Sequence, residues 1–262
     1  MATDFKGLRP QWKANCEEER LLGVDVTGQM DCPAFQDAQV MRTLRDHAIA
    51  VNKEYAALLG INQSAAVTCV KPSGNSAALL DCSSGLHARH SPYYIRRVRV
   101  GASGALYKVL RDAGVSLSPE NGQSADNATT WVASFPIAAP AGTATKAQRN
   151  AITQLEYWKT VKLNWCEHSP SATIGYDTDE LPVMIDWLYD NQRIISGLSF
   201  LQNTNPAYDQ LPYEEISQEQ YMAMAAAMPC IDWSLISVYE SEDYTTAASE
   251  IACSAGACDL NW

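Results

Sequence analysis

The amino-acid sequence predicts an α/β fold, and three observations lead to this prediction. Short β-prone runs alternate with amphipathic helical stretches along the chain, which is typical of α/β proteins. The chain has 262 residues, 47% of them hydrophobic, which is enough for one large domain or two small ones with a real core. No internal repeat or low-complexity linker interrupts it.

The first half of the chain begins with a charged stretch, 11–22, that predicts a helix. Within 33–59, the apolar residues Val40, Leu44, Ala48 and Val51 recur at helical spacing, and Gly60 is placed to end this second helix. The elements expected next are a strand over 64–70, a helix that starts in 75–80, a strand over 93–100 and a helix over 106–113.

The second half continues the alternation. Asp177 is a plausible cap for one of its helices, and Pro136 is expected to end its first strand. Three methionines in the last helix, Met222, Met224 and Met228, are best explained as core or interface packing. The expected elements are a strand over 129–137, a helix over 146–165, strands over 171–176 and 195–201, and helices over 181–189 and 217–228.

The net charge of −11 argues against a general nucleic-acid binder, because affinity for phosphate backbones depends on clustered Lys and Arg. The charge is nevertheless uneven. A basic cluster opposed only by Asp81 suits a small anionic ligand, although a solvated basic strand gives the same pattern. The cluster consists of Lys71, Arg89, Arg96, Arg97 and Arg99.

No apolar run reaches the roughly 18 residues that a membrane span needs, and the first residues do not resemble a signal peptide. We therefore expect a soluble, cytoplasmic protein. The eight cysteines are irregularly spaced without paired CxxC motifs, so structural zinc is not expected. Most should be buried free thiols.

The segment from Lys71 to Ser76 predicts an anion-binding turn. A strand ends at Pro72, Ser73 and Gly74 follow, and a helix is expected to open at Asn75 and Ser76. Free backbone N–H groups at a helix start bind anions, and glycine allows a close approach. The spacing is not that of a Walker loop. This pattern, taken alone, is also compatible with an ordinary capped connection between a strand and a helix.

Six runs resemble the class II, adenosylcobalamin-dependent ribonucleotide reductases, and the likeness extends over most of the chain from about residue 21. In that family the K-P-S-G turn holds the substrate phosphates, which implies this role for Ser73, Gly74, Asn75 and Ser76. Many members have Thr-Val at the last two positions, so the donors differ. The runs are VKPSGNSAALL at 70–80, SSGLH at 83–87, HSPYYIRRVR at 90–99, NWCEHSPS at 164–171, ISGLSFL at 195–201 and LPYEEI at 211–216.

A C-x4-C pair, Cys253 and Cys258, lies a few residues from the end. Two thiols joined by small residues can close a ring and reopen by thiol–disulfide exchange. In the family, a C-terminal cysteine pair re-reduces the active-site disulfide and is recharged by thioredoxin. The resemblance implies this catalytic role for the pair, whereas two unremarkable thiols in a tail are the alternative.

Two further candidates are set aside. The family's radical cysteine lies in an N-P-C-G-E-like finger loop, but Cys16 between Asn15 and Glu17 lacks the Pro and Gly and lies in a charged helical run. His87 and His90 have no carboxylate or Cys ligand at fixed spacing, so polar contacts near the phosphate site are expected there, and no metal site is expected.

The resemblance implies the C-terminal half of a ten-stranded α/β barrel over 1–240, followed by a mobile acidic tail over 241–262. It implies part of an enzyme that uses adenosylcobalamin to form a thiyl radical and converts ribonucleoside di- or triphosphates to deoxyribonucleotides for DNA replication. The expected partners are ribonucleotide substrate, thioredoxin or a similar dithiol donor, and the reductase's N-terminal half. The chain alone should be inactive.

Two alternatives remain open. One is a non-catalytic half-barrel that binds nucleotides or pairs with another protein. A stand-alone dithiol carrier is disfavoured, because Cys253 and Cys258 lack the CxxC-before-helix context.

Overall fold

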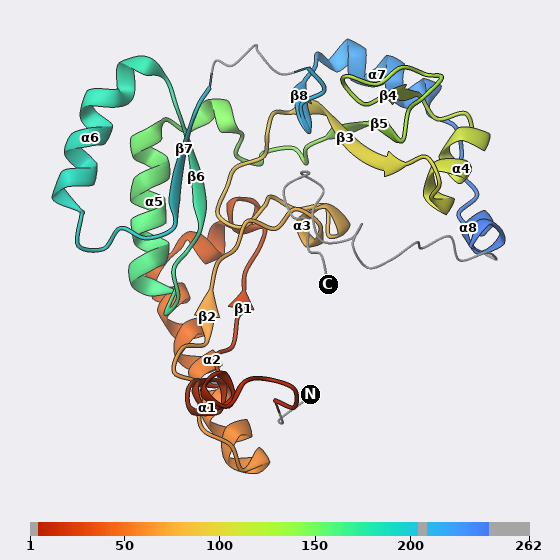
Figure 1. The fold of residues 1–262 in the computed structure, drawn as a ribbon. Helices are drawn as coiled ribbons and strands as arrows, with labels where there is room; N and C mark the ends of the chain where they lie inside the picture. Colours follow the sequence, from red (N-terminus) through yellow and green to blue (C-terminus); the bar gives the residue numbers. More distant parts are fainter. Residues whose placement is uncertain (1–4, 204–208, 241–262) are drawn as a thin grey trace. The chain divides into compact units, whose positions relative to one another are not determined.

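The computed structural model describes residues 5–203 and 209–240, and these fall into two units (Figure 1). The first unit takes in residues up to Pro92 and those from Ala139 to residue 203. The second takes in Tyr93–Ala138 and the residues from 209 onward. Both mix helices and strands, so the expected α/β class is confirmed.

The first unit combines long helices with short parallel strands. Its helices are α1 (Pro10–Glu19), α2 (Ala38–Leu59), α3 (Ser76–Leu79), α5 (Ala151–Asn164) and α6 (Leu181–Asp190), with 3-10 turns η1 (Gln29–Asp31), η2 (Pro33–Gln36), η3 (Lys146–Gln148) and η4 (Thr178–Glu180). Its strands are β1 (Val24–Asp25), β2 (Thr68–Cys69), β6 (Ala172–Tyr176) and β7 (Leu198–Gln202).

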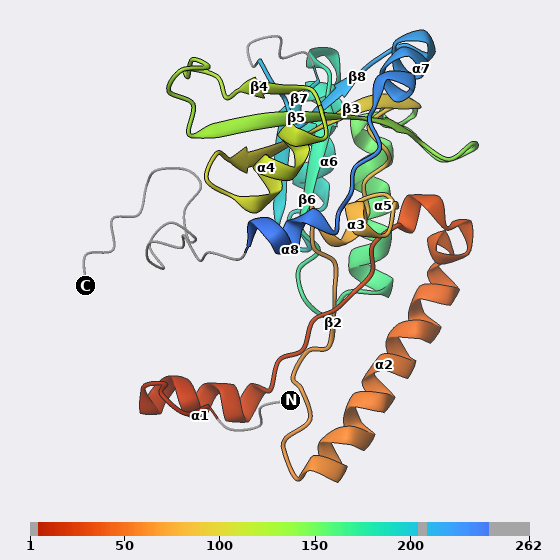
Figure 2. The ribbon, with the colours of Figure 1, turned by 90° about the vertical axis from the view of Figure 1, so that its right-hand side faces the viewer.

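The core of this unit forms around α5, which contacts β6 and α6 (Figure 1). Leu155, Trp158 and Val161 recur three residues apart and are all 0% exposed, so one helix face is entirely covered. The Trp158 indole N–H donates to the carbonyl of Pro170 at 2.9 Å, which satisfies its polar atom inside the core. Figure 2 shows α2 as a long, continuous helix, and it packs against α5.

The four strands of this unit form two parallel pairs. β1 pairs with β2, and β6 pairs with β7. Between these pairs, the carbonyl of Thr68 accepts from the N–H groups of Glu167 and His168, and the carbonyl of Val70 accepts from Ser171 at 3.1 Å. The segment before β6 thus lies along β2. The described residues form no closed barrel, so the expected half-barrel is not established by the fold alone.

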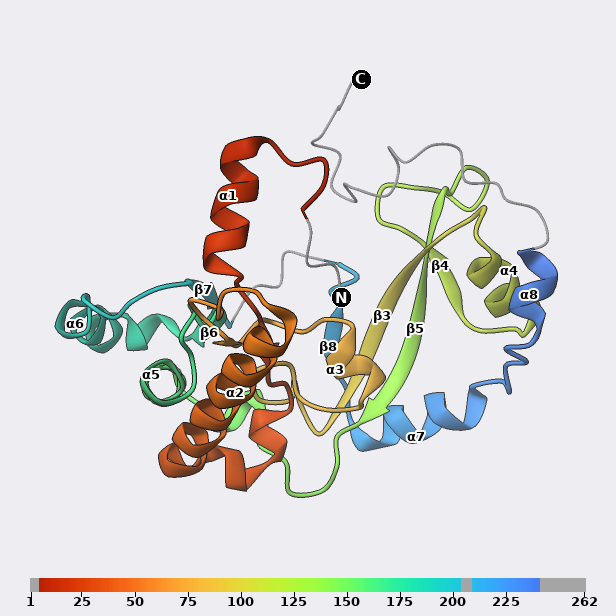
Figure 3. The ribbon, with the colours of Figure 1, turned by 90° about the horizontal axis from the view of Figure 1, so that it is seen from below.

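The second unit is an antiparallel sheet with strand order β4-β5-β3-β8, seen with its helices in Figure 3. Leu110 of the first helix and Ala133 of the central strand are almost fully buried at the centre of its core. The elements are β3 (Tyr93–Gly101), α4 (Ala105–Asp112), β4 (Leu117–Pro119), β5 (Thr130–Ala138), β8 (Tyr213–Glu215), α7 (Gln218–Ala227) and α8 (Leu235–Tyr239).

The longest expected elements are confirmed within a few residues, and the caps agree. Gly60 ends α2 in the left-handed conformation, and Asp177 caps the turn before α6. Pro136 was expected to end its strand, but it lies inside β5 opposite Ile95. Proline is tolerated there because β4 pairs only with Trp131–Ala133, which leaves that side of β5 open at Pro136.

The strand expected over 64–70 is reduced to Thr68–Cys69. Four short elements, β1, β4, β8 and α8, are not among those expected, because two to five residues show too little periodicity. Of the three methionines expected to pack, Met228 contacts the core of the second unit, but Met222 is 61% exposed. No helix in the described part of the chain is long and apolar enough to cross a bilayer.

Candidate functional site

The chain leaves the sheet of the first unit directly after Val70 and forms the turn that the sequence singles out. The backbone N–H of Lys71 donates to Oδ1 of Asp25, at the end of β1, at 2.9 Å. Pro72 then removes one backbone donor, which ends strand pairing. The hydroxyl of Ser73 accepts from the N–H of Ala77 at 2.9 Å and also bonds the hydroxyl of Ser76. The side chain of Ser73 therefore holds the turn closed.

The peptide groups of this turn are open. Gly74, Asn75 and Ser76 are exposed, and their backbone N–H groups donate to no acceptor within the described residues. A Cβ added at Gly74 would meet no atom within 4 Å, so the backbone is accessible to a ligand at this point. Consecutive free N–H groups in a turn form a concave anion site. The turn is arranged as the sequence predicts, although α3 behind it is only four residues long.

The basic cluster is not a free positive patch, because carboxylates pair with three of its five residues, Arg89, Arg97 and Arg99. Arg89 is 5% exposed and lies 3.1 Å from a carboxylate oxygen of Asp31 and 2.9 Å from one of Asp81. In the second unit, Arg97 pairs with Glu214 and Arg99 with Glu120. A count of charges over neighbouring residues does not reveal these carboxylates, because most of them come from distant segments of the chain. Lys71 remains exposed at the start of the turn.

A supporting segment, defined here as Ser83–Arg89, follows α3 and is bonded along most of its length. Its first carbonyl, that of Ser83, accepts from the N–H of Gly28 at 2.7 Å and from the hydroxyl of Thr27 at 3.0 Å. The N–H of Gly85 donates to that same Thr27 hydroxyl at 2.9 Å. The carbonyl of Gly85 accepts from Gln29 at 3.2 Å. The residues that follow β1, Thr27–Gln29, therefore anchor this segment.

Gly85 brings the supporting segment into contact with the turn. Its φ of +54° favours glycine, and an added Cβ would lie 2.9 Å from the carbonyl oxygen of Lys71. Gln29, which bonds Gly85, is 0% exposed and accepts from the hydroxyl of Tyr157 at 3.0 Å. Burial raises the pKa of Tyr157, so this hydroxyl stays protonated and can donate. The roles of four residues are not predictable from sequence patterns, because their partners are distant in sequence: Thr27, Gln29, Asp31 and Tyr157.

His87 bonds two backbone groups. The N–H of Thr173, in β6, donates to Nε2 at 3.0 Å, so Nε2 is the acceptor nitrogen. Nδ1 must then carry the proton, and it donates to the carbonyl of Ser84 at 3.0 Å. Burial lowers the pKa of His87, which favours this neutral ring. The polar contacts of His87 are therefore two hydrogen bonds to backbone groups. In the described part of the chain, no group of three or more His, Cys, Asp or Glu side chains is placed to hold a metal ion.

The proposed redox cysteines, Cys253 and Cys258, lie outside the described residues. Of the other cysteines, Cys16 lies in α1 and is half-buried. Cys69 and Cys166 are buried, and burial raises the pKa of both thiols, to about 12 for Cys166. Since the thiolate is the reactive form, these two are unsuited to thiol exchange.

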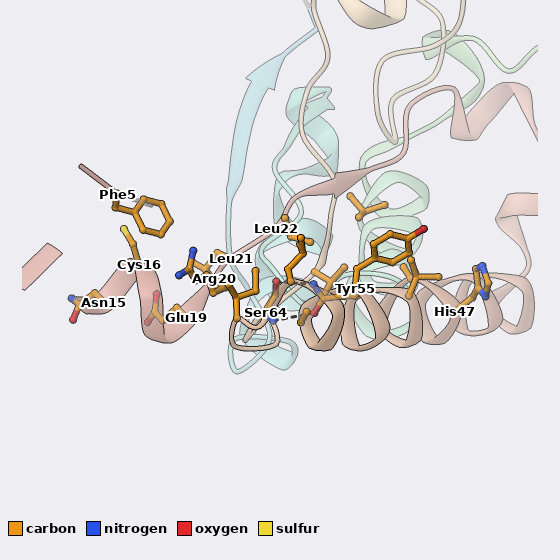
Figure 4. Close-up of a pocket in the computed structure, with 18 residues that line it drawn as sticks. Phe5, Asn15, Cys16, Glu19, Arg20, Leu21, Leu22, His47, Tyr55 and Ser64 are labelled. Atoms are coloured by element: carbon orange, nitrogen blue, oxygen red, sulfur yellow. Dashed lines mark hydrogen bonds between the residues drawn. The ribbon is translucent and has the colours of Figure 1, made fainter. Parts of the chain in front are cut away.

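An apolar cavity of about 940 Å³ lies elsewhere in the first unit, between α1, the chain leading into β1 and α2 (Figure 4). Leu21, Leu22 and Tyr55 are among the side chains directed toward it. It shares no residue with the Lys71–Ser76 turn. This cavity is therefore a separate feature, distinct from the Lys71–Ser76 turn.

The fold and the open turn define an α/β protein with a candidate phosphate site, and comparison with known proteins narrows this class. No family model matches the chain. A crystal structure of a B12-dependent (class II) ribonucleotide reductase aligns with a TM-score of 0.67 at 23% identity, covering 78% of this chain and 29% of that one. The fold thus corresponds to part of a class II reductase.

Two curated relatives give the sequence evidence. A probable adenosylcobalamin-dependent ribonucleoside-triphosphate reductase of Dictyostelium discoideum is 30% identical over 70% of this chain and 24% of its own length. The adenosylcobalamin-dependent ribonucleoside-triphosphate reductase of Lactobacillus helveticus is 27% identical over 86% of this chain and 30% of its own length. The chain is therefore homologous to adenosylcobalamin-dependent ribonucleotide reductases, and it spans less than a third of these two relatives.

The apolar cavity does not suit the cofactor of these relatives. The corrin ring carries many amide groups, which need hydrogen-bonding partners when they are bound away from water. The apolar cavity offers mainly aliphatic and aromatic side chains, including Val51, Leu59 and Ile61. These residues do not fit adenosylcobalamin, and no contact with it is assigned to this chain.

Proposed function

We propose that the chain is one part of an adenosylcobalamin-dependent ribonucleotide reductase and binds the substrate phosphates at Ser73, Gly74, Asn75 and Ser76. The observation that carries this proposal is the row of open N–H groups at Gly74, Asn75 and Ser76, in a chain homologous to ribonucleoside-triphosphate reductases. The substrate would be a ribonucleoside di- or triphosphate.

The turn suits binding and orientation of phosphate rather than its cleavage. Backbone N–H groups and the side chains of Asn75 and Ser76 supply hydrogen bonds, and exposed Lys71 supplies positive charge. Asp25 holds the backbone of Lys71 in place. Fixing the phosphates positions the ribose for reaction, which is a contribution of orientation.

The second proposed contribution is a thiol relay through Cys253 and Cys258. In this role the pair reduces the disulfide formed in each turnover and becomes a disulfide itself, which thioredoxin or a similar dithiol then reduces. The support for this proposal is their C-x4-C spacing in a chain related to the reductases.

The finger loop and the other barrel strands would come from the N-terminal half of the reductase, of which this chain is a fragment or a split subunit. We propose that this chain contributes the C-terminal half of the ten-stranded barrel. The short parallel pairs β1–β2 and β6–β7, joined along β2, are consistent with one half of such a sheet.

The decisive experiment is co-expression of the chain with the reading frame encoded upstream of it. With adenosylcobalamin, a dithiol and ribonucleoside triphosphate, the isolated chain should form no deoxyribonucleotide. A co-purifying partner with an N-P-C-G-E-like loop should restore turnover. The matched variant Cys253→Ser should stop turnover supported by thioredoxin, whereas Cys230→Ser, at an exposed position in the second unit, should not.

Two results would count against the proposal. Turnover by the isolated chain would show that no partner is needed. Nucleotide binding without turnover in the presence of such a partner would instead favour the alternative, a non-catalytic half-barrel that binds nucleotides.

A further inference from the structure

His87 lies where the strand pairing of β2 is interrupted. The segment before β6 donates to β2 at Thr68 and then at Val70, two residues further along. In a parallel ladder the next donor, two residues beyond Ser171, is the N–H of Thr173, and its acceptor would be the carbonyl of residue 72. The chain has already turned away at Pro72, so the ladder offers this N–H no acceptor.

The imidazole of His87 takes the place of that acceptor. Nε2 accepts the N–H of Thr173 at 3.0 Å, on the side of β6 that faces away from β7. The neighbouring residue, Ala172, donates to Gly197 on the β7 side, which agrees with the alternation of a parallel strand. Thr173 is exposed, and the ring of His87 gives its N–H an acceptor that the strand ladder does not supply.

The backbone of His87 belongs to the same unit of structure as the turn. Its N–H and its Nδ1–H both donate to the carbonyl of Ser84. One residue further, Gly85 contacts the carbonyl of Lys71 so closely that a Cβ would lie 2.9 Å away. A movement of the supporting segment away from β6 would therefore be transmitted directly to Lys71.

We infer that His87 is a positioning residue for the Lys71–Ser76 turn: its ring replaces the missing strand neighbour of Thr173 and so fixes the supporting segment behind the open N–H groups. The inference deepens the proposed phosphate-binding role and rests on it. His87 itself does not contact the ligand in this scheme. It acts through Ser84, Gly85 and Lys71.

Protonation of His87 reverses the role of Nε2, because the imidazolium has two donors and no acceptor. Apart from burial, the groups that act on its titration are the backbones of Ser84 and Thr173, and no charged side chain of the described residues contributes. The pKa of His87 in the folded chain lies below the usual 6.5. The hydrogen bond from Thr173 to Nε2 is therefore complete above pH 6.5 and is lost as the pH falls through the folded pKa.

The test uses NMR on the full chain, with sulfate as the probe because its charge is constant where histidine titrates. In the wild type, the nitrogen chemical shifts of the His87 ring should show the neutral Nδ1–H tautomer. The Thr173 N–H should be protected from hydrogen exchange with solvent. His87→Leu should expose that N–H and weaken sulfate binding at Gly74–Ser76 about tenfold. His87→Gln, which keeps an acceptor, should restore both and remove the pH dependence.

The outcomes separate the two proposals. The inference is overturned if His87 has the other tautomer, a measurement that needs no variant, or if His87→Leu binds sulfate as well as wild type. If the wild type binds no sulfate at the turn, the phosphate-binding role fails. The positioning role is then decided by whether the Lys71–Ser76 amide resonances shift in His87→Leu but not in His87→Gln.

Discussion

The turn Lys71–Ser76 and the supporting segment Ser83–Arg89 are close in sequence and in contact in space, but they treat their polar groups in opposite ways. The turn exposes three backbone N–H groups that bond nothing in the described chain. The supporting segment is bonded along most of its length and buries Arg89. A binding surface needs unsatisfied groups, and such groups hold a fixed geometry only when the structure behind them is fully bonded. Substitutions in the two regions should therefore differ in kind.

The largest effect on stability is expected for Arg89→Met. Asp31 would keep a half-buried carboxylate after losing its cation, and loss of one partner of a buried ion pair costs about 3–5 kcal/mol. Urea unfolding followed by circular dichroism measures this cost. Arg45→Met, which removes an exposed pair with Asp46, is the control and should change stability by less than about 0.5 kcal/mol.

Gly85→Ala should have the next largest effect. Its left-handed backbone alone costs about 1–2 kcal/mol with any other residue, and the contact with Lys71 adds to that. Gly60→Ala is a matched control, because Gly60 has a similar φ of +63° but nothing within 4 Å of an added Cβ. Urea unfolding of both variants isolates the contact. Equal losses of stability in Gly85→Ala and Gly60→Ala would show that the close contact between Gly85 and the carbonyl of Lys71 adds no cost.

Tyr157→Phe should cost about 1–2 kcal/mol, because the buried Gln29 loses its donor and the anchor of Gly85 is weakened. The exposed Tyr55 provides the comparison: Tyr55→Phe should leave the midpoint of urea unfolding unchanged. A loss of stability in the Tyr55 variant equal to that of Tyr157→Phe would contradict the assigned role of the Gln29 bond.

The smallest effect on stability belongs to the turn itself. Asn75→Ala removes an exposed side chain that makes no hydrogen bond within the described residues. The free energy of unfolding should therefore change by less than about 0.5 kcal/mol. Sulfate or nucleotide binding, measured by NMR titration, should nevertheless weaken. Unchanged binding in this variant would mean that the backbone alone holds the anion, and a large loss of stability would erase the contrast between the two regions.

Sequence patterns predict the parts of this structure whose causes are local. Helical spacing and Gly60 locate α2, and the Pro-Ser-Gly turn is found where the sequence places it. The supporting network could not be predicted in the same way. Arg89 meets Asp31 across 58 residues, and His87 meets Thr173 across 86. Pairings at such distances depend on which strands become neighbours, and no periodicity reports that.

The way β2 ends has a consequence for how this chain can change over evolutionary time. Thr68, Val70 and the ring of His87 accept successive donors of the segment that leads into and begins β6. The number of residues between β2 and the turn is therefore set by this ladder. A one-residue insertion or deletion between Cys69 and Ser73 would move every later group to the opposite face. A substitution at Asn75 removes its side-chain donor but leaves the backbone donors of the turn in place. Relatives of this chain should therefore differ in residue identity within the turn but keep the same number of residues.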